Sequence, residues 1–285
     1  MRTFLTLSTV IALTGCAVII APNDDVQVRS IFSSDAVVGD GHLGTEQRAI
    51  GSLPGLEVSG PVHVDVRVGG QPGLRVEADA NLLPLLRTEA QGSNLKIWVE
   101  GNVRTQNPMR VTYTVPSLTQ IRSSGSGRLI VSELNGAPLS FSKSGSGSTE
   151  LSGRESNLDL QSSGSGSVNA SGLQSGITNL NLSGSGRMTL GQVNAESLTA
   201  SVHGSGEVQA SGRVQNLNAR VHGSGGANLT GVSSERADLA TNGSGDISAN
   251  VRQSLVAHSN GSGRITVYGN PAQRNTSGKN VQVLQ

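Results

Sequence analysis

The sequence has little of what usually marks a reactive or strongly charged protein. It holds one cysteine, Cys16, in 285 residues, which excludes an intrachain disulfide and a metal cluster built on cysteines. The 21 Lys and Arg nearly cancel the 20 Asp and Glu, so no overall field recruits nucleic acid or an anionic membrane surface. Aromatic residues make up only 2%, and Tyr268 is the only one after Phe141. Platforms on which sugars could stack are therefore scarce in the second half.

The sequence also has no apolar run long enough to span a bilayer as a helix. The longest apolar run lies at the N-terminus. Residues 3–13 follow Arg2 and are too few to span a bilayer as a helix. The run ends in Leu-Thr-Gly-Cys at residues 13–16, which resembles the lipobox of a bacterial lipoprotein signal peptide. The resemblance implies removal of residues 1–15 and lipidation of Cys16, and Ala17 in place of aspartate implies the outer membrane. The alternative is an ordinary secretory signal peptide cut later, for instance after Ala21, and both predict export.

Glycine, by contrast, is abundant, with 38 residues, and much of it recurs as the tripeptide Gly-Ser-Gly. The tripeptide occurs eight times, at intervals of 18 to 20 residues, with first glycines at Gly125, Gly145, Gly164, Gly184, Gly204, Gly223, Gly243 and Gly261. A fixed period in this range is typical of a solenoid, in which each repeat forms one coil and neighbouring coils complete each other's core.

Apolar residues keep a period of two around every tripeptide. With the first glycine as position zero, positions −4, +4 and +6 are apolar in every repeat, apart from Thr149 at +4. Odd positions are polar. This alternation predicts strands with one buried face. Both glycines stand at even positions, so a strand running straight through the tripeptide would point them inward and the serine outward.

We therefore predict an all-β parallel β-helix with about 19–20 residues per flattened or three-sided coil. A β-sandwich also has short, evenly spaced strands, but it does not repeat one tripeptide. The expected organisation is a tether over residues 16–50, a β-rich region over 51–118 that continues or caps the helix, the repeats over 119–270 and a tail over 271–285. Residues 81–90 are the only helical candidate, and Pro84 weakens it.

Two other glycine-rich structures do not fit the spacing. Calcium-binding nonapeptide repeats need an aspartate every nine residues, half the period found. A phosphate or dinucleotide loop needs one glycine cluster between a strand and a helix, and no helix is expected after any tripeptide. No cofactor is predicted.

Stacked coils would bring equivalent residues side by side, so each column is a candidate site. The column before the first glycine is a possible contact ladder, formed by Ser124, Ser144, Ser163, Ser183, His203, His222, Asn242 and Asn260. His203 and His222 could suggest a metal, but zinc takes three or four ligands and the flanking serine and asparagine are poor ones, so no metal site is predicted.

A catalytic centre has weak support. Glu207 and Asp246 share a column two coils apart, about 9.5 Å, near the upper end for an inverting glycosidase pair. Arg187 and Arg264 stand one coil away, however, and a nearby cation lowers the pKa of a carboxyl group, which does not suit a general acid. The tripeptide serines have no histidine at a constant offset, so a nucleophile and base pair is unsupported.

The whole pattern resembles the bacterial putative auto-transporter adhesin, head GIN domain family. The resemblance covers residues 48–270 and rests on residues 55–60 leading into 62–68, the strands at 95–99 and 111–115, and the serial Gly-Ser-Gly coils. It implies a right-handed β-helix at the cell surface with an adhesive role, and it offers no catalytic residues. We expect a non-catalytic, lipid-anchored envelope protein that binds a protein or glycan ligand and no nucleic acid. The alternatives are a polysaccharide-cleaving enzyme and a purely structural envelope component.

Overall fold

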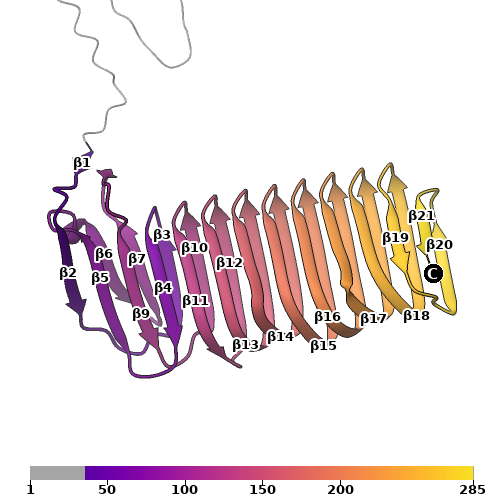
Figure 1. The fold of residues 1–285 in the computed structure, drawn as a ribbon, viewed down its shortest axis with the longest axis horizontal. Coiled ribbons are helices and arrows are strands. Elements are labelled where there is room, and N and C mark those ends of the chain that lie inside the picture. Colours follow the sequence, from indigo (N-terminus) through magenta and orange to yellow (C-terminus); the bar gives the residue numbers. More distant parts are fainter. Residues whose placement is uncertain (1–35, 285) are drawn as a thin grey trace, which may run out of the picture.

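The computed structural model describes residues 36–284, which form a parallel β-solenoid (Figure 1). The coils stack along the long axis, from an N-terminal cap to the last strands of the chain. The prediction of an all-β solenoid is confirmed. Among the described residues the only helical element is η1, a single 3₁₀ turn at Leu83–Leu85, so the helix considered for residues 81–90 is wrong. Pro84 sits in that turn, and the chain extends again directly after it.

The strands fall into three groups along the chain. The N-terminal group is β1 (Val37–Val38), β2 (Leu43–Arg48), β3 (Gly55–Ser59), β4 (His63–Val68), β5 (Gly73–Asp79), β6 (Leu86–Gln91), β7 (Asn94–Val99), β8 (Val103–Arg104) and β9 (Arg110–Val115). The repeats form β10 (Gln120–Gly125), β11 (Arg128–Asn135), β12 (Leu139–Gly145), β13 (Ser148–Gly164), β14 (Ser167–Gly184), β15 (Arg187–Gly204), β16 (Glu207–Gly223), β17 (Gly226–Gly243), β18 (Asp246–Gly261) and β19 (Ile265–Tyr268). The chain then forms β20 (Gln273–Ser277) and β21 (Val281–Leu284).

Each coil has two long sides. Side A is the stack of strands that run into the first glycine, such as β10, β12 and the second half of β13, with Ile121, Phe141 and Leu160 in register. Side B is the stack that follows the second glycine, such as β11 and the first half of β13, with Leu129 paired with Thr149. In each coil a short stretch connects side B back to side A. The pairing register between neighbouring coils shifts where this stretch begins.

The Gly-Ser-Gly tripeptide is the corner between side A and side B. Strands end at the first glycine and resume after the second, as β13 ends at Gly164 and β14 begins at Ser167. All eight first glycines have φ between +96° and +125°, a left-handed conformation that strains residues with a side chain. The strand therefore bends at the tripeptide instead of running straight through it. The first glycines are exposed or half-buried, and the second glycines are buried from Gly147 onward.

Close stacking of the corners also requires glycine. In one corner, the amides of Ser185 and Gly186 both donate to the carbonyl of Gly164 in the preceding coil, at 3.0 and 3.1 Å. A Cβ atom on Gly184 would lie 2.6 Å from that same oxygen. A side chain at this position would therefore push two coils apart.

The predicted core positions are confirmed. Every residue at positions −4, +4 and +6 of the eight repeats is buried, including Ile121, Leu129 and Val131 in the first. Most are Leu, Val, Ile or Ala, so the core is a thin layer between sides A and B. Burial of apolar surface in this layer is the main favourable contribution to folding.

One more coil precedes the repeats. Strands β3 and β4 pair in parallel with β10 and β11, and Gly60 takes the corner position, because a Cβ on Gly125 would lie 2.6 Å from the Gly60 carbonyl oxygen. Strands β7 and β9 pair with the other edges of β3 and β4. The stacking order therefore differs from the chain order, since the coil of β7 and β9 lies outside the coil of β3 and β4.

Antiparallel strands cover the N-terminal end. Strand β6 pairs with β7, β5 pairs with β9, and β2 pairs with β5. Residues 36–50, expected to belong to a tether, thus contribute two strands, because β2 joins the cap and β1 pairs with β8. The buried carboxylate of Asp79 accepts hydrogen bonds from Thr105 Oγ1 (2.5 Å) and Asn107 Nδ2 (2.6 Å), which lower its pKa and hold the loop after β8 on the cap.

The C-terminal segment is also part of the solenoid. Strand β20 pairs in parallel with β18, and β21 pairs with β19. The expectation of a tail over residues 271–285 is therefore wrong for residues 273–284, which form the last coil. Its corner holds Gly278, with φ of +96°.

Candidate binding face

The predicted contact ladder is assembled on the outer surface of side A. Consecutive members are Cα partners in register, from Ser124 with Ser144 through Asn242 with Asn260. Ser59 of β3 pairs with Ser124 and extends the column by one coil. The same register, continued by one residue past Val58 and Ile97, brings Trp98 of β7 to the head of the column. Side A thus carries one unbroken polar row that ends at the single tryptophan.

Hydrogen bonds join the ladder residues to the coil before them. Ser124 Oγ donates to Ser59 Oγ at 3.1 Å, and Ser163 Oγ donates to the Lys143 carbonyl at 3.4 Å. Nδ2 of Asn242 lies 3.3 Å from Nε2 of His222. Most of these side chains are exposed, so the row is both ordered and accessible.

The two histidines of the ladder stack on each other. Their ring centroids are 5.0 Å apart and the planes differ by 3°. This stacking keeps the rings parallel, one coil apart, rather than converging on a common point. Among residues 36–284, no group of three or more His, Cys, Asp or Glu is close enough to hold a metal ion. The two histidines are therefore part of the polar row.

The carboxylates of Glu207 and Asp246 are held by neighbours. Glu207 Oε2 lies 3.4 Å from Arg187 Nε, and Gln209 donates to its other oxygen at 3.0 Å. Asp246 Oδ1 accepts a hydrogen bond of 2.7 Å from the backbone amide of Arg264. Gly226 separates the two carboxylates in register, as the column predicted. Both carboxylates are therefore already engaged by neighbouring residues.

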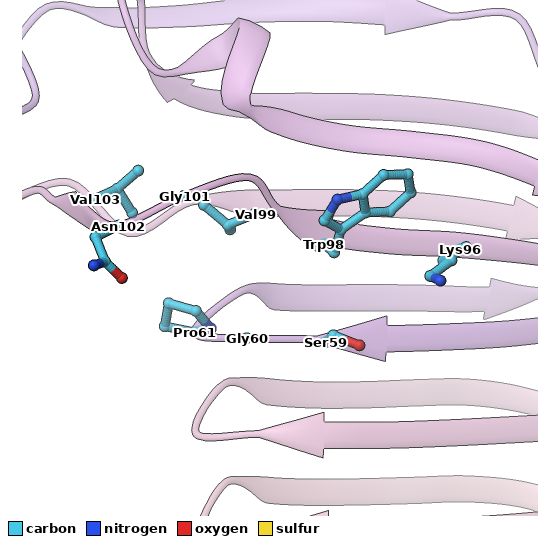
Figure 2. A pocket seen from close by; sticks show the side chains of 9 residues that line it. All are labelled: Ser59, Gly60, Pro61, Lys96, Trp98, Val99, Gly101, Asn102 and Val103. Atoms are coloured by element: carbon cyan, nitrogen blue, oxygen red, sulfur yellow. The ribbon is translucent and has the colours of Figure 1, made fainter. Parts of the chain in front are cut away.

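A hollow of about 620 Å³ opens beside Trp98 (Figure 2). Its lining comes from β7 and the segment after it, and from the corner of the neighbouring coil: Ser59, Gly60, Pro61, Lys96, Trp98, Val99, Gly101, Asn102 and Val103. Lys96 Nζ lies 5.4 Å from the centroid of the Trp98 ring and 3.9 Å from Glu57 Oε1. The hollow combines an aromatic ring with polar side chains. Sequence reasoning missed it, because the residues that line it come from two separate stretches of the chain, 59–61 and 96–103.

Besides Asp79 in the cap, two charged residues in the described part of the chain are buried inside the coils, and sequence reasoning missed both. Lys143 is 2% exposed, and burial lowers the pKa of its ammonium group. Glu155 is 4% exposed, neither carboxylate oxygen has a hydrogen-bond partner among the described residues, and burial raises its pKa to about 8. Lys143 stands at the even position −2, so the period of two could have located it, whereas Glu155 follows a register shift that breaks this period.

The predicted lipidation site, Cys16, lies outside the described residues, as does the whole predicted signal peptide of residues 1–15. Within residues 36–284, no helix is long and apolar enough to cross a membrane.

Comparison with known proteins agrees with this architecture. The family described as "putative auto-transporter adhesin, head GIN domain" matches residues 53–192 and 175–271. The chain belongs to this family. None of the curated proteins compared with the chain matches it.

Solved structures share the fold of this adhesin-family chain. A putative lipid binding protein from Parabacteroides distasonis ATCC 8503 has a TM-score of 0.67 and 23% identity, covering 88% of this chain and 100% of its own. A putative adhesin from Parabacteroides merdae ATCC 43184 has a TM-score of 0.68 and 20% identity over the same shares. A putative adhesin from P. distasonis ATCC 8503 has a TM-score of 0.61 and 20% identity, covering 87% of this chain and 99% of its own.

Proposed function

We propose that the protein is a non-catalytic, lipid-anchored protein of the bacterial cell envelope that binds or adheres through the outer surface of side A. The observation that carries the proposal is the in-register polar row that runs from Asn260 to Ser59 and reaches the hollow at Trp98. A solenoid suits this role, because stacked coils present an extended ordered surface. Membership of an adhesin family supports the binding role.

The anchor is proposed from the sequence at residues 13–16, and its location in the outer membrane is proposed from Ala17 after the cysteine. Palmitate labelling of the protein in its host tests it. We expect label on the parent, none on Cys16→Ser, and accumulation of the unprocessed form with globomycin. Unlabelled parent protein would contradict lipidation and favour an ordinary secretory signal peptide.

The binding role is tested by attachment of producing cells to surfaces coated with mucin or with extracellular polysaccharide. We expect Trp98→Ala to reduce attachment, because Trp98 lines the hollow at the end of the polar row. Tyr268→Ala is the matched control, since Tyr268 is an exposed aromatic residue of side B. Cells that attach no better than cells lacking the protein would contradict an adhesive role and favour a purely structural component.

The absence of catalysis is tested with the two carboxylates of the Glu207 column. If the protein cleaves polysaccharide through them, the Glu207→Gln, Asp246→Asn variant loses turnover on a panel of glycans. We expect no turnover by the parent protein. Turnover that the double variant abolishes would establish the enzyme alternative.

A further inference from the structure

A groove runs along the solenoid where the chain enters side A. One hollow of about 410 Å³ extends from Thr119 to Asn179, and another of about 430 Å³ extends from Ser197 to Val256. Asn179 and Thr199 are Cα partners in adjacent coils, so the second hollow begins where the first ends. We call the two together the axial groove. It crosses eight coils, and the seven steps between them, at about 4.8 Å each, make it roughly 34 Å long.

The groove repeats the same architecture in each coil. Its floor is an inward residue, such as Leu158 or Leu198, and its rims are the residues on either side. Small hydrogen-bonding side chains dominate the rims: Asn157, Ser197 and Asn216 on one, and Asn179, Thr199 and Asn218 on the other. Ile177 is an exposed apolar residue of the first rim: it pairs with Asn157 and is 44% exposed.

Each of the few charged residues along the groove has an ion-pair or hydrogen-bond partner. Arg236 donates from Nε to Asn216 Oδ1 at 3.1 Å, and Asp238 lies 3.1 Å from the guanidinium of Arg220. The side-chain amide of Gln161 donates to Asp159 at 3.4 Å. A charged polymer would find no excess of opposite charge here, and nucleic acid binding needs Lys or Arg against each phosphate.

The strands that form the groove are also already paired through their backbones. Its strands are paired with the coils on both sides, from β13 through β18. A peptide that binds as an added strand needs a free sheet edge, which this surface does not offer. Recognition must come from side chains, and the ligand must repeat its contacts at the spacing of the coils.

We propose that the axial groove binds a linear, uncharged polysaccharide, with roughly one sugar unit over each coil. Sugar rings present hydroxyl groups that donate and accept, which match Asn, Ser and Thr, and C–H faces that match the apolar side chains of Pro138, Ile177 and Val256 along the rims. The inference rests on the proposed function and specifies its ligand class. Each sugar contributes little without an aromatic platform, so affinity accumulates over linked units.

The test measures binding by the full-length lipoprotein purified in detergent. The probes are β-1,4-glucan, β-1,4-mannan and α-1,4-glucan oligosaccharides, from disaccharide to heptasaccharide, titrated by calorimetry. For at least one of these glycans we expect affinity to rise at least about tenfold from disaccharide to hexasaccharide, because longer chains span more coils. Polygalacturonate serves as the charged comparison, and we expect it to bind more weakly than the neutral series.

Matched variants locate the binding. Asn179→Arg with Thr199→Arg places two long cations on one rim, and Asn169→Arg with Thr189→Arg places the same changes on the same two strands, on side B. We expect the groove pair to lose at least about tenfold in affinity and the side B pair to stay within about twofold of the parent, with equal thermal midpoints.

The inference is overturned if no neutral glycan binds, if polygalacturonate binds better, or if both pairs lose affinity equally. If cells with the groove pair still attach like the parent while the glycans do not bind, the groove inference fails and the proposed function stands. If the parent protein supports neither attachment nor glycan binding, both fail.

Discussion

At the residue scale, the two glycines of each corner have different tasks. Gly184 has a left-handed φ of +108°, and a Cβ there would also meet the Gly164 carbonyl oxygen. Gly186 has no such φ, but its Cβ would lie 2.4 Å from the Gly166 carbonyl oxygen. Ser185 between them is exposed. The recurring tripeptide is therefore a requirement of corner stacking, and its serine is free to vary.

Alanine substitutions separate these tasks. We expect Gly184→Ala and Gly186→Ala each to lower the free energy of unfolding by about 1–3 kcal/mol, through backbone strain and crowding of the neighbouring coil. Ser185→Ala should stay within about 0.5 kcal/mol of the parent. Urea denaturation followed by circular dichroism measures all three. Equal effects of the glycine and serine changes would contradict the assigned roles.

The buried carboxyl group of Glu155 makes stability depend on pH. Its pKa of about 8 in the folded state exceeds its ordinary value of 4.5, so the folded protein binds a proton that the unfolded chain has released. The free energy of unfolding should therefore fall as pH rises from about 5 to 8, by at most about 1.4 kcal/mol per pH unit.

Glu155→Gln removes this titration and keeps the side-chain size. We expect its stability to be nearly flat over the same pH range, measured by urea denaturation at each pH. Parent and variant curves that fall in parallel would show that another group is responsible.

The repeat allowed most core residues to be predicted, and the exceptions have physical reasons. Positions −4, +4 and +6 are buried as expected, because the period of two fixes which side chains face inward. The ladder column stacks in register for the same reason. Lys143 and Glu155 were passed over because charged residues are almost never fully buried unless paired, and composition gave no sign of these two.

At the scale of single elements, strand β20 shows how an edge of the solenoid is protected. In β20, Arg274 and Thr276 pair with the buried residues Leu255 and Ala257, so they occupy positions that face the core in earlier coils. Arg274 Nε donates to the Pro271 carbonyl at 2.8 Å. An inward-pointing charge on an edge strand discourages pairing with another chain.

Restoring apolar residues at these positions should favour association. We expect Arg274→Val with Thr276→Val to increase self-association in sedimentation velocity over a concentration series. Gln273→Val with Asn275→Val adds the same residues at the alternate positions of β20 and is the control. If both pairs associate equally, general hydrophobicity is the cause and the protective role of Arg274 is wrong.

Elements outside the repeat were the hardest to predict. Strands β2, β20 and β21 lie in segments expected as tether and tail, because they lack the tripeptide and their pairing with β5, β18 and β19 has no local sequence signal. Strands β3 and β4 pair directly with β10 and β11, although strands β5 to β9 lie between them in the sequence. Such nonlocal order cannot be inferred from spacing. The groove and the hollow at Trp98 combine several segments and were missed for the same reason.

At the scale of the whole molecule, the solenoid should tolerate removal of a coil. Residues 184–203 span one period, from one first glycine to the residue before the next. Because each coil contacts mainly its neighbours, the deletion should leave a folded protein with an unchanged β circular dichroism spectrum and a lower unfolding midpoint. Aggregation or loss of the β signal would contradict a modular stack. The same deletion shortens the axial groove by one coil.

The proposed binding face exists only if equivalent positions of successive coils stack in register along one axis. Spin labels on cysteines introduced at ladder positions measure this directly by pulsed electron resonance, in a Cys16→Ser background. Ser124 with Asn242 spans six coil steps and Ser124 with Asn260 spans seven, so we expect distances of about 29 and 34 Å. Ser59 with Asn260 adds one more step, for about 38 Å. Distances that do not grow with the number of coils, or that spread without a maximum, would contradict the stacked face.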